Sequence, residues 1–188
     1  MSPQAFDRRA LTGLLDEVAT ELQGHNATGR LYLVGGSAIA LGYDDTRVTH
    51  DVDARIDGNH GKVIDAVREV GRRHGLPSTW VNEQATPYMP RTADTKAISV
   101  FYHPNLEVKA ASREHLLAMK LTAGRGVDLD DAQMLISQSR APLSADHVAS
   151  LISTLYGEDA LTNQVADNIA TINFEDRRLD PPAPGLGL

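Results

Sequence analysis

Two short groups of residues in the first third of the chain carry the types and the spacing needed for phosphate and metal chemistry. Gly35-Gly36-Ser37 follows a short apolar run, and Asp51-Val52-Asp53 comes farther along. Residues two apart on a strand share a face, so both carboxylates should lie together while Val52 points to the core. Paired carboxylates repel unless a cation lies between them, and Mg²⁺ takes carboxylate oxygens together with substrate phosphates. A glycine turn opening a helix supplies N–H groups to a phosphate. Together they predict a site for a metal-bound nucleoside triphosphate.

Each group also has a purely structural explanation. An edge strand with one face in water would alternate in the same way around Asp51 and Asp53, and a strand–helix turn can use glycine for a positive φ and Ser37 as a helix N-cap. The turn and the carboxylate pair at this spacing in one chain favour the functional interpretation.

The same residues resemble a known superfamily. Gly35-Gly36-Ser37 followed by Asp51-x-Asp53 resembles the signature of the DNA polymerase β-like nucleotidyltransferases. The fuller pattern, made of segments 32–37, 47–53 and 116–121, resembles the AbiEii/MenT-type nucleotidyltransferase toxins of type IV toxin–antitoxin systems. The resemblance runs from about residue 31 to residue 135. It implies transfer of nucleotides from NTP to an RNA end, most plausibly the 3′ end of tRNA, with Mg²⁺ or Mn²⁺ as the metal and a cognate antitoxin protein as partner.

Lys120 and a nearby aspartate are the site residues expected after the carboxylate pair. Lys120 lies in an apolar run, where its stem could reach the surface or its ammonium could meet a triphosphate; the resemblance places a lysine here in the active site. The resemblance also implies an aspartate just beyond, and Asp131 is the first choice, Asp128 the second and Asp130 the third. Asp128 and Asp131 also read as a near capping box, with acids at N-cap and N3.

Two further residues are candidates for contacting the metal or a phosphate. Glu107 is the only acid on the later predicted strands, so it is the candidate for a third metal ligand beside Asp51 and Asp53. Arg47, ahead of the carboxylate strand, is a candidate for gripping a phosphate, although a surface role fits it equally well. Gly35, Gly36, Ser37 and Asp128 complete the predicted substrate-binding set. The seven histidines show no zinc-binding spacing.

Composition narrows the class of protein. The 188-residue chain has no cysteine, which excludes disulfides and thiolate chemistry, and no apolar run approaches a membrane span. We therefore expect a soluble, cytoplasmic protein. The net charge of −7 is uneven: residues 46–125 carry twelve basic and nine acidic side chains, whereas residues 126–188 carry three and ten. The basic middle tolerates an RNA substrate. The candidates for contacting its backbone are Arg68, Arg72, Arg73, Arg91, Lys96, Lys109 and Arg113.

Apolar periodicity predicts the order of elements. A helix starting at Ser2-Pro3 should run to Gly24, followed by strands over 30–34 and 51–56 with a short helix over 37–41 between them. A helix over 62–74, a long loop with a short strand near Trp80, and a hairpin over 97–110 should follow. Four helices should then begin at about Ser112, Asp128, Ser144 and Glu158.

This order predicts an α/β (α+β) nucleotidyltransferase core, with a mixed β-sheet flanked by helices and a helical C-terminal subdomain. The expected boundaries are 1–111 for the core, 112–179 for the helical subdomain and 180–188 for a flexible tail. Acceptors other than RNA remain open, namely a small molecule such as an aminoglycoside or a protein hydroxyl. A nucleotide-binding module that lost catalysis is the alternative outside enzymes, although the presence of both carboxylates and Lys120 weighs against it.

Overall fold

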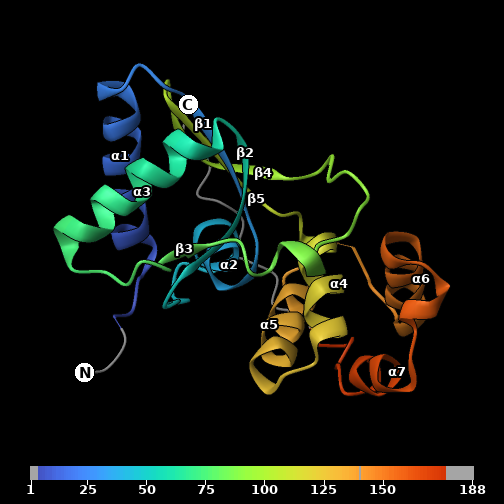
Figure 1. Cartoon of the computed structure of the whole chain (residues 1–188). Helices are drawn as coiled ribbons and strands as arrows, with labels where there is room; N and C mark the ends of the chain where they lie inside the picture. The colour runs from blue at the N-terminus through green and yellow to red at the C-terminus, as the bar shows by residue number, and fades with distance from the viewer. Residues whose placement is uncertain (1–3, 140, 177–188) are drawn as a thin grey trace, which may run out of the picture. The chain divides into compact units, whose positions relative to one another are not determined.

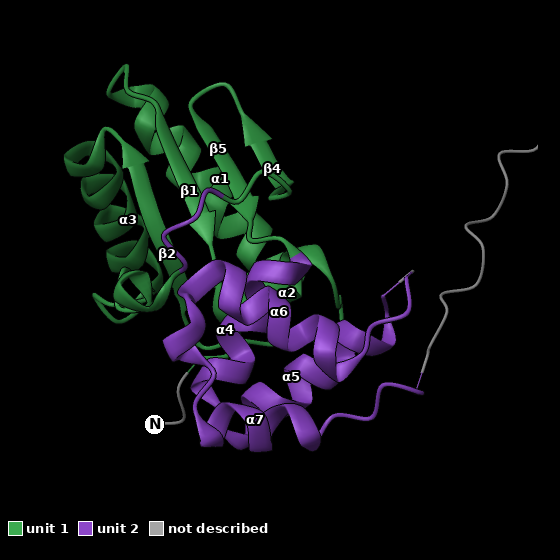
Figure 2. Ribbon diagram, turned by 90° about the vertical axis from the view of Figure 1, so that its right-hand side faces the viewer, with its two compact units in different colours: residues 1–89, 94–112 green, residues 90–93, 113–188 purple. Residues whose placement is uncertain are grey.

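The computed structural model describes residues 4–139 and 141–176. The chain forms two compact units, coloured separately in Figure 2. Unit 1 comprises Met1–Met89 and Asp94–Ser112, and unit 2 comprises Pro90–Ala93 and Arg113–Leu188. The sequence predicts a core that ends at residue 111, and unit 1 ends at Ser112. The predicted tail, 180–188, lies outside the described residues.

Unit 1 is a mixed five-stranded sheet with helices packed on it (Figure 1). Its elements are α1 (Arg8–Gly24), β1 (Gly29–Leu33), α2 (Gly35–Gly42), β2 (Val52–Gly58), α3 (His60–His74), β3 (Val81–Asn82), a 3₁₀ turn η1 (Thr86–Tyr88), β4 (Ile98–His103) and β5 (Leu106–Ala110). The strand order is β3-β2-β1-β5-β4. β1 pairs antiparallel with β2 and parallel with β5. The predicted α+β fold class with a mixed sheet is confirmed.

The core of unit 1 lies between the sheet and its helices. Alternate strand residues such as Leu31, Val52 and Val108 are buried, as period-2 alternation requires when one face of a sheet is covered. α3 supplies Val63 and Val67 to this layer, and α1 packs beside α3. The other face of the sheet carries the polar residues of β1, β2 and β5, and the candidate site belongs to that face.

Unit 2 is helical, as predicted. It contains α4 (Arg113–Ala123), α5 (Gly126–Ser137), α6 (Ala145–Tyr156), a 3₁₀ turn η2 (Glu158–Ala160) and α7 (Asn163–Ala170). Ser144 caps α6, since its hydroxyl accepts the N–H of His147. Asn168 of α7 ties that helix to α4 by donating to the carbonyl of Leu121 at 2.8 Å. Among the described helices, none combines the length and the apolar character needed to cross a bilayer.

Three helix boundaries differ from the prediction. α1 begins at Arg8 with Asp7 as N-cap, because the backbone of Phe6 instead bridges to Thr49; Ser2 and Pro3 lie outside the described residues. α5 begins at Gly126 with Arg125 as N-cap, so the capping box predicted at Asp128 is wrong. The predicted last helix is divided into η2 and α7, with Thr162 as the N-cap of α7.

Candidate active site

The glycine turn is packed against the segment that carries the two aspartates. Gly35 opens α2 with a φ of +62°, and a Cβ built on it would lie 2.8 Å from Oδ2 of Asp53. A Cβ on Gly36 would lie 2.8 Å from Oγ1 of Thr49. Both distances are too short for a side chain, so only glycine allows the turn to approach the segment 49–53 this closely.

Backbone pairing fixes this approach. β1 and β2 are antiparallel with Leu33 opposite Ala54, and one step beyond, the N–H of Val34 donates to the carbonyl of Asp53 at 3.0 Å. The end of β1 and the start of β2 are therefore adjacent. As predicted, Val52 is buried in the core, while Asp51 and Asp53 are half-buried.

The N-terminus of α2 adds a favourable field beside Asp53. The first N–H groups of a helix lack intrahelical acceptors and form its positive end. α2 has no acidic residue in its first turn, and its N-cap, Val34, has no side chain that could accept these N–H groups. The arrangement of glycine turn, helix N-terminus and adjacent carboxylate is suited to a phosphate bound together with a cation.

Ser37 has a different environment from the one predicted. It lies inside the first turn of α2, so it is not the N-cap. Its side chain is buried, and its hydroxyl donates to the carbonyl of Val34 at 3.1 Å. To donate to a phosphate, the Ser37 hydroxyl would first have to break its hydrogen bond to the carbonyl of Val34. In the structure as described, Ser37 holds the turn and the N–H groups of Gly35 and Gly36 are the nearer donors.

Asn82 is a site residue that sequence reasoning missed. β3 pairs with β2 so that Asn82 lies opposite Asp53, and its amide Nδ2 donates to Oδ2 of Asp51 at 3.3 Å. Its Oδ1 accepts the N–H of Gln84 at 3.0 Å, which fixes the orientation of the amide. The sequence does predict a short strand near Trp80. A two-residue strand is too short for its pairing register with β2 to be predicted, so the contact of Asn82 with Asp51 could not be foreseen.

Lys120 lies in unit 2 and has acidic partners within that unit. Its side chain is 8% exposed, and Nζ lies 2.7 Å from Oδ1 of Asp128 and 2.9 Å from Oδ2 of Asp131. The structure therefore brings Lys120 together with the first two of the three predicted aspartates, while Asp130 is exposed. The ammonium does not reach the surface, and the anion that a buried ammonium requires comes from α5.

Asp128 is the most enclosed member of this cluster, which we call the Lys120 cluster (Lys120, Arg125, Asp128 and Asp131). Arg125 contacts it from Nε at 2.6 Å. Burial alone would raise the pKa of the Asp128 carboxyl, but the hydrogen bonds from Arg125 and Lys120 outweigh burial and hold that pKa below its ordinary value. Asp128 is therefore an ion-pair partner that stays charged.

Glu107 is placed away from the carboxylate pair. The register sets Glu107 of β5 opposite Arg30 of β1, and Arg30 opposite Asp57 of β2. Asp57 is four residues from Asp53, which is about 13 Å along a strand. A third metal ligand at Glu107 alongside Asp51 and Asp53 is inconsistent with this register. Within the described residues, no group of three or more His, Cys, Asp or Glu side chains is arranged to hold a metal ion.

The remaining predicted contacts involve arginines. Arg47 lies half-buried on the segment between α2 and β2. The cations of α3 are exposed as predicted, but two of them face acids: Arg72 pairs with Glu69 at 2.7 Å, and Arg73 pairs with Glu17 and Glu21 of α1. Two of the three arginines thus already have acidic partners, and RNA contact by this face of α3 stays a prediction.

The sequence relationship agrees with this geometry. Residues 10–177 match the family described as nucleotidyltransferase of unknown function (DUF6036). The chain belongs to this nucleotidyltransferase family. The match includes the glycine turn, both aspartates and the Lys120 cluster.

One solved structure shows a more distant similarity to the chain. A crystal structure of an antigenic nucleotidyltransferase-like protein from Paracoccidioides brasiliensis is similar at 15% identity and a TM-score of 0.42, over 90% of this chain and 96% of that chain. At this level of similarity, the activity of that protein does not transfer to this chain. No curated protein matches the chain.

The donor set of this nucleotidyltransferase fits a hard divalent cation that arrives with its substrate. Asp51 and Asp53 offer carboxylate oxygens, and Mg²⁺ is commonly bound through one or two carboxylates, with substrate phosphates and water completing its coordination. The contact of Gly35 with Oδ2 of Asp53 sets the glycine turn beside one of these carboxylates. Asp51 and Asp53 are the residues that would hold the ion.

Proposed function

We propose that the protein is a metal-dependent nucleotidyltransferase that transfers nucleotides from NTP to the 3′ end of tRNA in the cytoplasm, and so acts as a toxin that blocks translation. The observation that carries the proposal is the contact between Gly35 and Asp53. It brings the glycine turn, which we propose to bind phosphate, next to a carboxylate that we propose to bind the metal. Membership in a nucleotidyltransferase family supports the reaction class, and the resemblance to AbiEii/MenT-type toxins supports the acceptor.

The chain's residues have distinct roles in the proposed reaction. The N–H groups at the start of α2, with Gly35 and Gly36, bind the triphosphate. Asp51 and Asp53 would hold a divalent cation, which would neutralise phosphate charge and polarise the α-phosphate. Asn82 orients the Asp51 carboxylate, leaving its Oδ1 for the ion. These groups are positioned before substrate arrives, which is how most phosphoryl-transfer catalysis is achieved.

The transfer itself is a displacement at phosphorus. The 3′ hydroxyl oxygen of the acceptor attacks the α-phosphorus of the NTP. A new phosphodiester bond forms as the bond to the β-phosphate bridging oxygen breaks, and pyrophosphate leaves. The hydroxyl proton passes to a carboxylate oxygen of the Asp51–Asp53 pair and then to solvent. Addition to the 3′ end of tRNA prevents aminoacylation, and a cognate antitoxin protein would then be required for survival of the cell.

Lys120 has a more indirect role in this proposal than the sequence alone suggested. Its charge is already balanced by Asp128 and Asp131 within unit 2. A triphosphate contact would require Nζ to exchange one carboxylate for a phosphate oxygen, with Asp131 or Asp128 left to accept another donor. We propose that Lys120 and Asp131 take part in this way, and that Asp128, paired with Arg125, remains the structural member of the cluster.

The test is incubation of the purified protein with total tRNA, Mg²⁺ and each α-³²P-labelled NTP in turn. Labelled tRNA that loses its label after 3′ exonuclease treatment supports the proposal. Label on a protein or on an added aminoglycoside, with none on RNA, would transfer the assignment to the other acceptors. Tight NTP binding with no labelled product on any acceptor would support the inactive nucleotide-binding module instead.

A further inference from the structure

The polar face of the sheet in unit 1 is organised in rows that cross the strands. Residues paired across neighbouring strands lie on the same face. The row next to Asp53 contains Arg55, Tyr32 and Lys109 on β2, β1 and β5. The guanidinium of Arg55 lies over the Tyr32 ring, 4.8 Å from its centroid. Two cations and a tyrosine therefore lie directly beside the carboxylate end of the sheet.

The next row leads into a cavity. It contains Asp57, Arg30, Glu107 and Tyr102 on β2, β1, β5 and β4. These four side chains help to line a cavity of about 400 Å³, together with Asn59 and His103. That volume lies within the range of small-ligand sites in proteins. Glu107, which the sequence suggested as a metal ligand, belongs to this cavity.

The charged groups of the cavity are held in place by neighbours on their own strands. Asp57 is bound by Arg55 at 3.0 Å, and Glu107 is bound by Lys109 at 3.2 Å. Arg30 lies between the two acids and makes no ion pair with a residue that the structure describes. The cavity thus offers one available guanidinium with an oriented carboxylate on each side.

Two further groups add stacking and hydrogen bonding. The side chain of Tyr102 is on the surface, at 76% exposure, so its ring is accessible to a ligand in the cavity. Nδ1 of His103 accepts the N–H of Asn105 at 3.1 Å, so the neutral ring carries its proton on Nε2 and can donate. An exposed aromatic ring beside an arginine is the arrangement with which proteins stack and hold the bases and phosphates of single-stranded nucleic acid.

We propose that this cavity binds a nucleotide of the single-stranded acceptor RNA, upstream of the reacting 3′ hydroxyl. Arg30 contacts a phosphate, Tyr102 stacks on the base, and Asp57 and Glu107 accept hydrogen bonds from an exocyclic amino group, as carboxylates do with cytosine N4. The inference rests on the proposed function, since it deepens the acceptor half of that reaction. Asp57 lies about 13 Å along β2 from Asp53, a separation that a short stretch of single-stranded RNA spans across the Arg55–Tyr32–Lys109 row.

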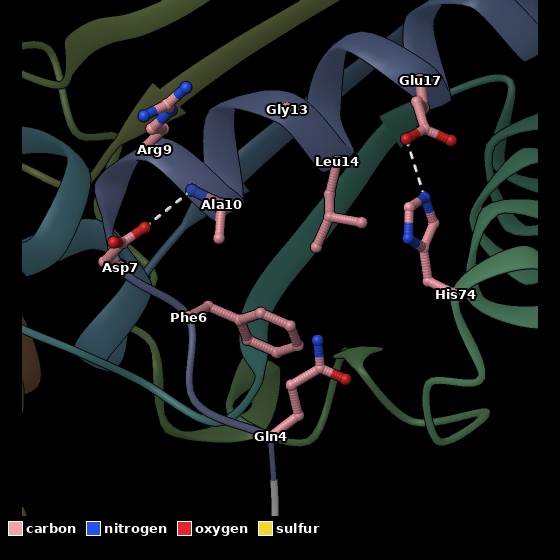
Figure 3. Close-up of a pocket in the computed structure, with 9 residues that line it drawn as sticks. All are labelled: Gln4, Phe6, Asp7, Arg9, Ala10, Gly13, Leu14, Glu17 and His74. Atoms are coloured by element: carbon pink, nitrogen blue, oxygen red, sulfur yellow. Dashed lines mark hydrogen bonds and ion pairs between the residues drawn. The ribbon is translucent and has the colours of Figure 1, made fainter.

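A second cavity in unit 1 lacks these features. It has a volume of about 440 Å³ and lies over α1, where Gln4, Phe6 and Leu14 meet His74 of α3 (Figure 3). Its acidic groups already have partners: Asp7 accepts the N–H of Ala10, and Glu17 pairs with His74 at 2.7 Å. It is lined by the segment before α1 and by α1 and α3, and not by the polar face of the sheet, so it offers no path from Asp53.

The test measures binding of fluorescein-labelled octamers of cytidine, adenosine and uridine to the full chain by fluorescence anisotropy. Uridine has no exocyclic amino group, so cytidine and adenosine octamers should bind on the order of 10-fold more tightly than the uridine octamer. Tyr102→Ala should weaken binding of all three by on the order of 10-fold. Glu107→Gln should remove much of the preference for cytidine, because an amide can donate where the carboxylate only accepts.

Tyr88→Ala is the matched control, since Tyr88 is also exposed, at 74%, and is outside the cavity.

The outcomes separate this inference from the proposed function. Full RNA binding by Tyr102→Ala, equal losses in Tyr102→Ala and Tyr88→Ala, or no binding of any octamer by the wild type would overturn the cavity assignment. If the octamers bind as predicted but no NTP is ever transferred, the RNA site stands and the proposed reaction fails. If tRNA is labelled normally by both Tyr102→Ala and Glu107→Gln, the reaction stands and the acceptor lies elsewhere.

Discussion

Gly35 and Asp53 are in direct contact, with so little space between them that a Cβ on residue 35 would lie 2.8 Å from the Asp53 Oδ2 atom. The contact joins the N-terminus of α2 to the start of β2, two segments that are 18 residues apart in the sequence. Residue 35 must therefore be glycine for two reasons: the close approach to Asp53 leaves no space for a side chain, and the backbone has a positive φ. It also means that a ligand on the turn and a cation on Asp53 would occupy neighbouring space.

Gly35→Ala should therefore abolish nucleotidyl transfer, because the new methyl group must displace the Asp53 carboxylate. The positive φ alone costs an L-residue roughly 1–2 kcal/mol. Gly75→Ala is the control, since Gly75 has a φ of +63° with no atom within 4 Å of an added Cβ. Both variants should lose similar stability in chemical denaturation, and only Gly35→Ala should lose activity in the labelling assay. Equal activity in the two variants would contradict a functional role for the contact.

Asn82→Ala should weaken the metal site while the fold is retained. Removing the amide frees Oδ2 of Asp51 to rotate, and loss of such an orienting partner typically reduces metal affinity or activity by about 10–100-fold. Binding of Mn²⁺ can be followed by electron paramagnetic resonance, in the presence of a non-hydrolysable NTP analogue, so that the measurement does not depend on turnover. Gln84→Ala is the control, because Gln84 contacts Asn82 only through its main-chain N–H. Unchanged Mn²⁺ affinity in Asn82→Ala would show that the hydrogen bond to Asp51 has no orienting role.

Lys120→Ala should lower the free energy of unfolding by about 3–5 kcal/mol, the usual cost of removing one partner from a buried ion pair. The reason is that Asp128 and Asp131 would be left buried without the ammonium that lies within 3 Å of each. The exposed Lys62 of α3 provides a comparison, and Lys62→Ala should change stability by less than about 0.5 kcal/mol. Chemical denaturation measures both. If Lys120→Ala loses activity at unchanged stability, Lys120 instead contributes only to substrate binding or catalysis and not to stability.

The stabilisation contributed by Asp128 should depend on pH with a definite sign. Its pKa in the folded protein is held below the ordinary value of 3.8, so the folded state favours the charged carboxylate. The contribution is present in full above the unfolded-state pKa and is lost as the pH falls through the folded-state pKa. The stability difference between wild type and Asp128→Asn should thus be constant near neutral pH and shrink only in acid below about pH 4. A difference that grows with acidification would show that burial prevails over the hydrogen bonds from Arg125 and Lys120.

Features that depend on residues close together in the sequence were predicted well, and features that depend on distant residues were not. The helices and strands of unit 1 followed from periodicity, and the Asp51–Val52–Asp53 alternation followed from strand geometry alone. The sequence could not show that Glu107 is level with Asp57 and not with Asp53, because the register between β1, β2 and β5 is a non-local property. The sequence suggested a triphosphate as the partner of Lys120, but the anions that contact it in the structure are Asp128 and Asp131 of the following helix. Arg73 was a candidate for contacting RNA, and its acidic partners, Glu17 and Glu21 of α1, are more than 50 residues away in the sequence.

Comparison of the wild type with Asp51→Asn and Asp53→Asn in the α-³²P-NTP labelling of total tRNA tests the central claim most directly. Asparagine preserves the shape of each side chain and removes the charge that would hold the cation, so all three proteins should have matched melting temperatures. We predict labelled tRNA with the wild type in the presence of Mg²⁺, and a loss of labelling by at least about 100-fold in each variant. Undiminished labelling by both variants at matched stability would contradict the assignment of this carboxylate pair as the metal-binding centre of the nucleotidyltransferase.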